Sequence, residues 1–171
     1  RNSFVLAALT AVLAALLAVL LGFAARDGKS LSRLAGRIVG LGYAVPGSVI
    51  AVGVLIPVTR LDHLLAGMWQ QLTGVNPGLI LTGGVAALVY AYLARFLAIA
   101  LQTVEAGFAR ITPSMEAAAR SLGSSPGETL RRVHMPLMRG SLLTASLLVF
   151  VDVMKELPAT LVMRPCNFDT L

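Results

Sequence analysis

Long apolar runs dominate the pattern of hydrophobic and polar positions along the chain. Four of them cover residues 4–25, 38–58, 79–101 and 142–163. Each has about 20 residues, the length that an α-helix needs to cross a bilayer. Segments of this kind must be helical, because lipid offers no hydrogen-bond partners to the backbone of an open strand. The pattern predicts an all-α membrane protein, a helical bundle with four spans within residues 1–171.

Two of these spans carry features that predict how their helices behave. Pro46-Gly47-Ser48 stands in the middle of the second span, where the missing backbone donor of proline favours a kink or a break. The third span is rich in small residues, which allow helices to approach closely in lipid. They are Gly83, Gly84, Ala86, Ala87, Ala91 and Ala94.

The segment between the second and third spans shows helical spacing of apolar residues over positions 61–72. We expect a short interfacial helix here, with Trp69 at headgroup depth and with Asp62 and His63 among its polar positions. Asn76 and Pro77 are expected to cap the third span, as its N-cap and first helical residue.

Composition and charge agree with a membrane protein. The chain is 57% hydrophobic and 13% charged, which excludes a soluble globular domain and a disordered chain. The net charge is +6, and nine of the fourteen cations fall in two loops, at residues 26–37 and 110–139. The positive-inside rule makes both loops cytoplasmic. The cations therefore reflect topology, and nucleic acid is not an expected partner.

The cytoplasmic segment 112–136 is punctuated as two short helices. Thr112-Pro113 is a helix start and Gly123 a helix stop. Ser125 and Glu128 have the spacing of a capping box, and Pro136 is expected to end the second helix. This pattern predicts a rigid helix-turn-helix outside the bilayer, which is a plausible docking surface for a soluble partner; a DNA-reading helix-turn-helix is a weaker alternative.

The same segment resembles the EAA loop in the permease subunits of bacterial ABC importers. Glu116-Ala117-Ala118 is followed by Gly123 and, after nine residues, by Val133-His134-Met135-Pro136. In that family the loop is a coupling helix that enters a cleft of the ATP-hydrolysing subunit. The resemblance implies that Glu116, Ala117, Ala118, Gly123, Val133, Met135 and Pro136 couple this chain to an ATPase. Glu116 and Arg120, at i and i+4, are expected to form a polar edge of the loop.

Further segments resemble the second half of the iron(III) transport permease. They are Asn2-Ser3, residues 42–47, residues 154–160 and the last eight residues. By this resemblance the chain is a fragment of a type I ABC importer permease, carrying its second to fifth spans. The resemblance implies the bacterial inner membrane, an external substrate-binding protein, a dimer of ATPase subunits and a companion permease half. It implies no cofactor in this chain, since ATP and Mg belong to the ATPase. Molybdate, thiamine, polyamine and phosphonate permeases share the pattern and remain alternative substrate classes.

The fourth span contains three ionisable residues, Asp152, Lys155 and Glu156. Each charge at the bilayer centre costs roughly 2.5–3.5 kcal/mol on insertion scales, so such residues are paired or hydrated. The spacing predicts that all three share one helical face, because they stand at i, i+3 and i+4. One hypothesis is that they line or gate the translocation pathway. The other is a structural salt bridge between helices, involving Arg95.

No enzyme or metal motif accompanies these features. His63 and His134 lie in different loops and are expected to be ordinary surface residues, and Cys166 is alone. A nucleophile with its base, a His-Glu-x-x-His motif and a Walker A motif are all absent from the sequence. We therefore expect a transport subunit rather than an enzyme, with no metal site of its own. A passive membrane scaffold is the remaining alternative.

Overall fold

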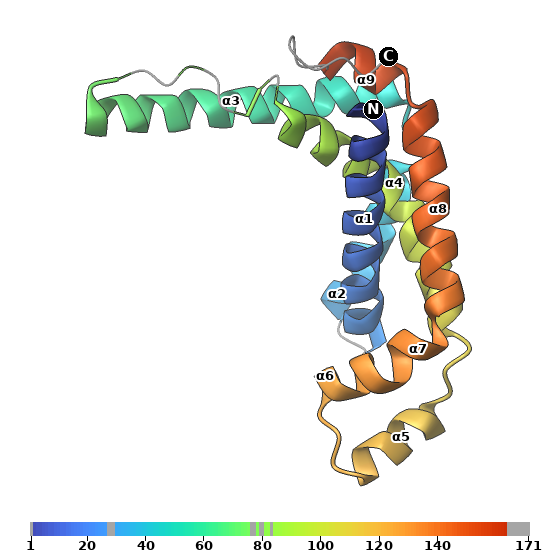
Figure 1. The fold of residues 1–171 in the computed structure, drawn as a ribbon. Helices are drawn as coiled ribbons and strands as arrows, with labels where there is room; N and C mark the ends of the chain where they lie inside the picture. Colours follow the sequence, from blue (N-terminus) through green and yellow to red (C-terminus); the bar gives the residue numbers. More distant parts are fainter. Residues whose placement is uncertain (1, 27–29, 76–77, 79–80, 83, 164–171) are drawn as a thin grey trace.

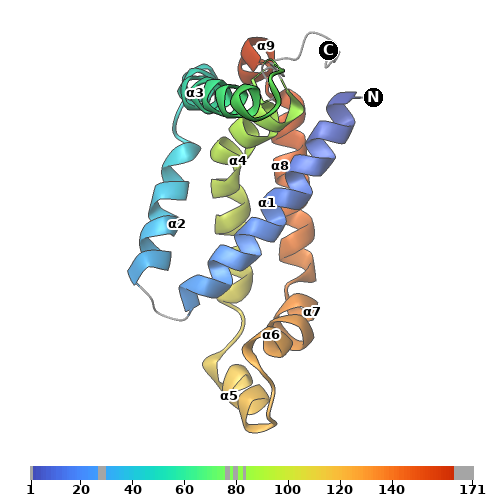
Figure 2. The same cartoon turned by 90° about the vertical axis from the view of Figure 1, so that its left-hand side faces the viewer.

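The structure is a computed structural model that describes residues 2–26, 30–75, 78, 81–82 and 84–163. Three long helices lie side by side and form the bundle (Figures 1 and 2). They are α1 (Asn2–Arg26), α4 (Val85–Phe108) and α8 (Arg139–Lys155). A fourth helix, α2 (Ser30–Gly42), packs against α4 and α1. The described residues contain no strand, and the prediction of an all-helical fold is confirmed.

The two ends of the bundle differ. At one end α3 (Gly47–Thr73) leaves the bundle sideways, close to α9 (Pro158–Met163) and to the N-terminus (Figure 1). At the other end lie the short helices α5 (Pro113–Ser121), α6 (Pro126–Thr129) and α7 (Met135–Leu137), with a π-helix, η1 (Leu130–His134), between α6 and α7. The end of α1 and the start of α2 lie at this same end (Figure 2). Both cation-rich segments therefore lie at one end of the bundle, as the positive-inside rule requires of two cytoplasmic loops.

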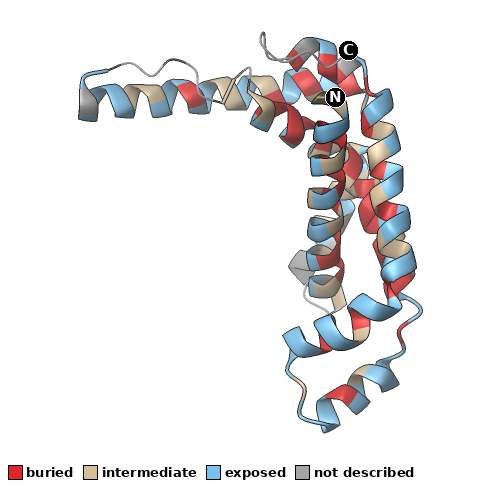
Figure 3. Ribbon diagram, viewed as in Figure 1, coloured by how far each residue is buried: buried red, intermediate tan, exposed pale blue. Residues whose placement is uncertain are grey.

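Small residues allow the helices of the bundle to pack closely. One side of α1 is buried through Ala7, Ala11, Ala14, Ala18 and Gly22, and Figure 3 shows the buried positions on the inward faces of the helices. A Cβ atom at Gly22 would lie 2.9 Å from the ring of Phe108 on α4. In α4, Ala87 and Ala91 are buried as expected, whereas Ala86 and Ala94 are exposed. Close packing thus also involves α1, whose small residues the sequence analysis had not singled out.

The segment predicted as the span 38–58 is divided between two helices. α2 ends at Gly42, α3 begins at Gly47, and Pro46 is the N-cap residue of α3 with an extended backbone. Proline cannot donate the next helical hydrogen bond, and it disfavours helical geometry in the residue before it. At Gly42 a Cβ would overlap the backbone oxygen of Ala94, so this turn lies directly against α4. The expected break is confirmed, and the single span is corrected to two elements.

α3 is one continuous helix from Gly47 to Thr73, so the separate interfacial helix at positions 61–72 was a wrong prediction. Pro57 lies inside α3 without ending it. The helix ends only at Gly74, whose φ of +72° is left-handed and whose N–H donates to the carbonyl of Gln70 at 2.8 Å. The apolar positions at the far end of α3 are all exposed; they are Leu61, Leu64, Leu65, Met68, Trp69 and Leu72.

Asp62 on α3 is fully buried, although the spacing placed it among the polar positions of an exposed helix. Its carboxylate accepts the backbone N–H of Leu81, at 2.8 and 3.0 Å, and that of Thr82. These two N–H groups precede α4, so Asp62 holds the entry to α4 against α3. The N-cap of α4 is Gly84. The predicted caps, Asn76 and Pro77, lie outside the described residues and do not begin α4.

The segment predicted as the span 142–163 is also broken. α8 ends at Lys155, and Glu156 follows with a ψ of 91°, which is not helical. α9 begins at Pro158. Because a residue before proline avoids helical geometry, Pro158 explains the break at positions 156 and 157. By length and composition α1, α3 and α4 could cross a membrane, and the segment from Pro126 to Lys155, bent by 76° before α8, could form a fourth span.

Candidate functional site

Local capping chemistry shapes the loop from Thr112 to Leu137, which we call the coupling loop. Thr112 is the N-cap of α5, and Pro113 is its first residue. Gly123 follows α5 with a φ of +81°, a left-handed conformation that favours glycine. The capping box of α6 is present: the Glu128 N–H donates to Ser125 Oγ at 3.3 Å, and the Ser125 N–H donates to Glu128 at 3.1 Å. These predictions from sequence are confirmed.

Pro136 does not end the second helix of the loop, contrary to expectation. The chain passes through the π-helix η1 and then α7, which contains Pro136 and ends at Leu137. The Met135 N–H donates to the carbonyl of Leu130, five residues back. A regular α-helix would bring the ring of Pro136 against the carbonyl four residues before it. The wider π turn relieves this clash, so the helix continues through the proline.

Glu116 of α5 faces the end of α1. Its Oε1 lies 2.8 Å from Nε of Arg26 and 3.1 Å from Nε2 of His134. Within the described residues Arg26 is the ion-pair partner of Glu116, and His134 is its close neighbour. Arg120, which was expected to share a polar edge with Glu116, is exposed on the same helix and lines the same cleft. The ion-pair partner of Glu116 is Arg26, a tertiary contact that the sequence pattern did not indicate.

Arg26 connects three elements through its guanidinium group. Nη1 donates to the carbonyl of Phe108 at 2.8 Å, and Nη2 donates to that of Ile111 at 3.1 Å. Both carbonyls belong to the end of α4 and its exit, where a helix leaves unpaired acceptors and favours a cation. The Nε atom completes the contacts by pairing with Glu116. Arg26 therefore fixes the coupling loop to the ends of α1 and α4.

His134 is buried, with 1% of its surface exposed, although the sequence suggested an ordinary surface residue. Its ring lies between Phe23 and Phe108, at centroid distances of 5.6 and 5.5 Å. Despite the 3.1 Å approach to Glu116, neither ring nitrogen makes a well-oriented hydrogen bond in the described structure. Burial lowers the pKa of His134, Glu116 opposes this shift, and Arg26 adds to it. His134 is therefore mainly neutral at pH 7.

Acidification is expected to loosen the coupling loop. The pKa of His134 is lower in the docked loop than its ordinary value of about 6.5. Stability therefore rises with pH between the two pKa values, and it is lost as the pH falls from about 6.5 toward the lowered pKa. Hydrogen exchange of residues 112–137 in the membrane complex, compared near pH 8 and pH 5.5 after correction for intrinsic rates, measures this effect. His134→Gln is the control, and an equal pH dependence in both proteins would contradict the prediction.

The coupling loop also presents a surface to solvent. Of the residues predicted to couple to an ATPase, five are exposed, Val133 is half-buried, and Glu116 faces the cleft. The exposed ones are Ala117, Ala118, Gly123, Met135 and Pro136. The sequence analysis missed Leu122 and Leu137, with exposed fractions of 85% and 58%. The sequence did offer a signal for the exposure of Leu122, because this apolar residue stands directly before the helix-ending Gly123 in an otherwise polar loop.

The ionisable residues of the fourth predicted span do not share one face. Glu156 is buried outside α8, and its Oε1 lies 2.8 Å from Nη1 of Arg95 on α4. Asp152 is half-buried and Lys155 is exposed, both on α8. The common face at i, i+3 and i+4 was a wrong prediction, because the helix ends at Lys155. Glu156 forms the contact with Arg95 that the salt-bridge hypothesis named.

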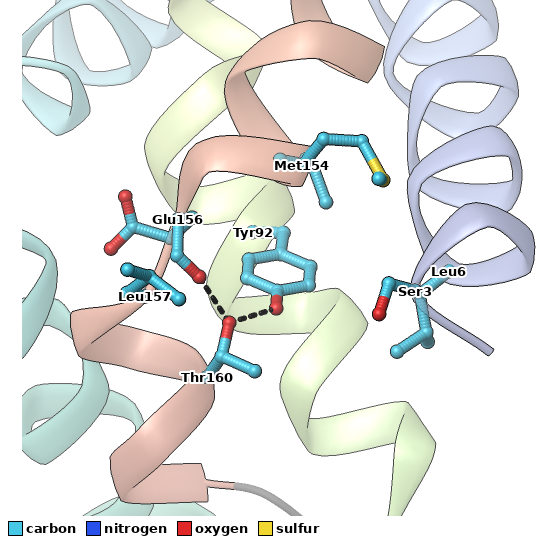
Figure 4. Close-up of a pocket in the computed structure, with 8 residues that line it drawn as sticks. Ser3, Leu6, Tyr92, Met154, Glu156, Leu157 and Thr160 are labelled. Atoms are coloured by element: carbon cyan, nitrogen blue, oxygen red, sulfur yellow. Dashed lines mark hydrogen bonds between the residues drawn. The ribbon is translucent and has the colours of Figure 1, made fainter. Parts of the chain in front are cut away.

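A small cavity of about 30 Å³ lies beside Glu156, between α1, α4 and the break after α8 (Figure 4). Thr160 donates its hydroxyl to the backbone carbonyl of Glu156, and its Oγ1 lies 2.6 Å from the hydroxyl of Tyr92. No group of three or more potential metal-ligating side chains occurs among the described residues. Cys166 and the end of the resemblance, at positions 164–171, lie outside the described residues.

These features agree with a family assignment. Residues 4–163 match the family described as "Binding-protein-dependent transport system inner membrane component". The match covers most of the chain, and the chain therefore belongs to this family of membrane transport components.

Individual relatives carry different substrate names. The chain is 29% identical over 171 residues to the "Fe(3+)-transport system permease protein FbpB 2" of Haemophilus influenzae, a match to 99% of this chain and 31% of the relative. It is 29% identical over 129 residues to the "Putative 2-aminoethylphosphonate transport system permease protein PhnV" of Salmonella typhimurium, covering 75% of this chain and 42% of the relative. It is 28% identical over 112 residues to the "Trehalose transport system permease protein SugB" of Mycobacterium tuberculosis, covering 66% and 40%. The chain thus spans well under half the length of these relatives.

Proposed function

We propose that this chain is part of the permease subunit of an ATP-driven importer in the bacterial inner membrane. The single observation that carries the proposal is the coupling loop. It lies at one end of the bundle, it is shaped by caps, and Arg26 fixes it to α1 and α4 through contacts of 2.8 to 3.1 Å. A displacement of a loop connected in this way is transmitted to both α1 and α4.

The proposal gives each loop residue a role. Ala117, Ala118, Met135 and Pro136 are exposed and contact the ATPase, together with the half-buried Val133. Small side chains on α5 allow close approach, and apolar ones bury surface on docking. Gly123 makes the turn that orients α5 relative to α6. The partner ATPase binds ATP and Mg²⁺, and this chain holds no cofactor of its own.

The substrate that we propose is ferric iron, delivered by an external binding protein and passed through a pathway shared with a companion permease half. The similarity to the Haemophilus influenzae iron permease supports this choice, since it extends over 99% of the chain. Of the three ionisable residues expected in the pathway, Asp152 and Lys155 would act on the substrate near its outer end, where a carboxylate oxygen suits a hard trivalent cation. Glu156 would act through its ion pair with Arg95. A phosphonate is the second candidate substrate, because the Salmonella relative matches 75% of the chain at the same identity.

Reconstitution tests the proposal directly. The complete transport system containing this chain, with its ATPase and binding protein, is placed in proteoliposomes, and uptake of ferric iron, molybdate, thiamine and a phosphonate is compared with and without ATP. We expect ATP-dependent uptake that is selective for iron. Uptake of another solute would overturn iron as the substrate but would still support an ATP-driven importer. An assembled complex without any ATP-dependent uptake would overturn the importer and favour a membrane scaffold.

A further inference from the structure

Two helix breaks meet at one residue of α4. The first lies between α2 and α3, at positions 43–46, and the second lies between α8 and α9, at positions 156 and 157. α3 and α9 pack against each other at this end of the bundle, and both contact α4. Arg95 extends from α4 to this junction, where its side chain meets Glu156. Proline explains why each helix breaks, but it does not explain why the two breaks lie together.

Glu156 is held from two sides at the second break. Its Oε1 accepts from Nη1 of Arg95 at 2.8 Å and from the backbone N–H of Ala159, in the first turn of α9, at 3.3 Å. The Glu156 side chain is 7% exposed and that of Arg95 is 21% exposed. Buried charges require partners, because an unpaired charge in an apolar environment is costly. The ion pair therefore connects α4 to the start of α9.

Gly47 places the first break against the same ion pair. It is the first residue of α3 and is buried. A Cβ atom at Gly47 would overlap both Arg95 Nη1 and Glu156 Oε1, the two atoms that form the pair. Both atoms are the ends of flexible side chains, so a methyl group here would displace the ion pair before it displaced any backbone. Glycine at this position is what allows α3, α4 and α9 to meet.

We propose that Arg95 and Glu156 are positioning residues that form a latch, closed in this structure, between α4 and the break before α9. The start of α3 packs against the closed latch at Gly47, and the latch opens during the transport cycle when these elements separate. Inside a membrane the two charged side chains are favourable either when they pair with each other or when both are hydrated. These two arrangements can serve as the two states of a conformational equilibrium. The inference rests on the proposed transport function and adds a device that couples the pathway to ATP hydrolysis.

Gly47→Ala tests the latch with a matched control on the same helix. Gly53 also lies on α3, but a Cβ atom there would have no neighbour within 4 Å, so Gly53→Ala leaves the latch intact. Both variants are measured in the complete complex in proteoliposomes. For Gly47→Ala we expect ATP hydrolysis without binding protein to rise about fivefold or more, the lower end of typical coupling between sites. The amount of substrate moved per ATP is expected to fall. For Gly53→Ala we expect both the hydrolysis rate and the amount of substrate moved per ATP to equal those of the wild type.

Charge exchange provides the second test. Arg95→Glu and Glu156→Arg are each expected to uncouple transport from hydrolysis, and the double exchange is expected to restore coupling because the pair forms again in reverse. A double variant that assembles but remains as uncoupled as the single variants would overturn the latch. Loss of hydrolysis and uptake in parallel with Gly47→Ala would assign the pair a structural role and also overturn it. If the wild-type complex transports nothing with ATP, the proposed function fails. If the wild-type complex transports with ATP, and Gly47→Ala and Gly53→Ala have the same hydrolysis rate and move the same amount of substrate per ATP, only the latch is refuted.

Discussion

Arg26→Ala is expected to lower ATP-driven uptake at least tenfold while the protein still inserts into the membrane. The substitution removes two hydrogen bonds, to the carbonyls of Phe108 and Ile111, and the ion pair with Glu116. Hydrogen bonds of charged groups contribute about 1.5–3 kcal/mol each when they are sheltered. Glu116 would keep His134 as its neighbour, and the pKa of that imidazole is already lowered by burial. Force applied to the loop would then no longer reach α1 and the end of α4.

Uptake and hydrolysis in proteoliposomes measure the effect of Arg26→Ala, together with hydrogen exchange over residues 112–137. Arg132→Ala is the matched control in the same loop. The Arg132 side chain is 74% exposed, and its Nη2 lies 3.7 Å from Oε1 of Glu128 on the preceding helical turn, a surface pair that contributes only about 0.3–0.5 kcal/mol. Arg26→Lys keeps the charge but loses the forked geometry, and we expect an intermediate result. Normal uptake by Arg26→Ala would refute the proposed connection between the loop and the bundle.

Gly123→Pro is expected to abolish transport and to leave membrane insertion intact. Gly123 has a φ of +81°, whereas proline fixes φ near −65°, so the turn between α5 and α6 cannot form with proline. The Gly123 N–H also donates to the carbonyl of Arg120 at 2.9 Å, and proline has no N–H to replace it. α5 would then present its exposed alanines in a different direction, and the loop would no longer fit the proposed ATPase partner.

Membrane fractionation and co-purification with the ATPase separate the possible outcomes for Gly123→Pro. We expect normal membrane levels, with little bound ATPase and no uptake. Gly127→Ala is the control, because Gly127 lies in α6 and a Cβ atom there would have no neighbour within 4 Å. Uptake at the wild-type level with Gly123→Pro would remove the argument that the loop works through a defined shape.

The predictions that succeeded rest on local chemistry. The capping box at Ser125 and Glu128, the helix start at Thr112 and the turn at Gly123 each depend on residues within a few positions. Long apolar runs likewise predict membrane helices, because lipid requires a helix to satisfy its own backbone. At both helix breaks a proline acts on its own neighbourhood in the chain, Pro46 before α3 and Pro158 at the start of α9.

The predictions that failed, and the contacts that the sequence did not indicate, depended on distant partners. Glu116 pairs with Arg26, which is 90 positions away along the chain. The burial of His134 depends on Phe23 and Phe108, and that of Asp62 on the backbone ahead of α4. Periodicity shows which residues share a face of one helix, but it does not show what faces that side. The prediction also assumed that the helix continues through Glu156, whereas α8 ends at Lys155.

The sequence by itself determined that this protein is a helical membrane component with a capped, cation-rich loop at one end, because hydrophobic length, loop charge and capping act over short distances along the chain. Only the tertiary structure decided which charges meet: Arg26 with Glu116 at the coupling loop, and Arg95 with Glu156 beside Gly47 at the two helix breaks. The physical reason is that a buried charge selects its partner by proximity in the packed bundle, where desolvation penalises every unpaired alternative.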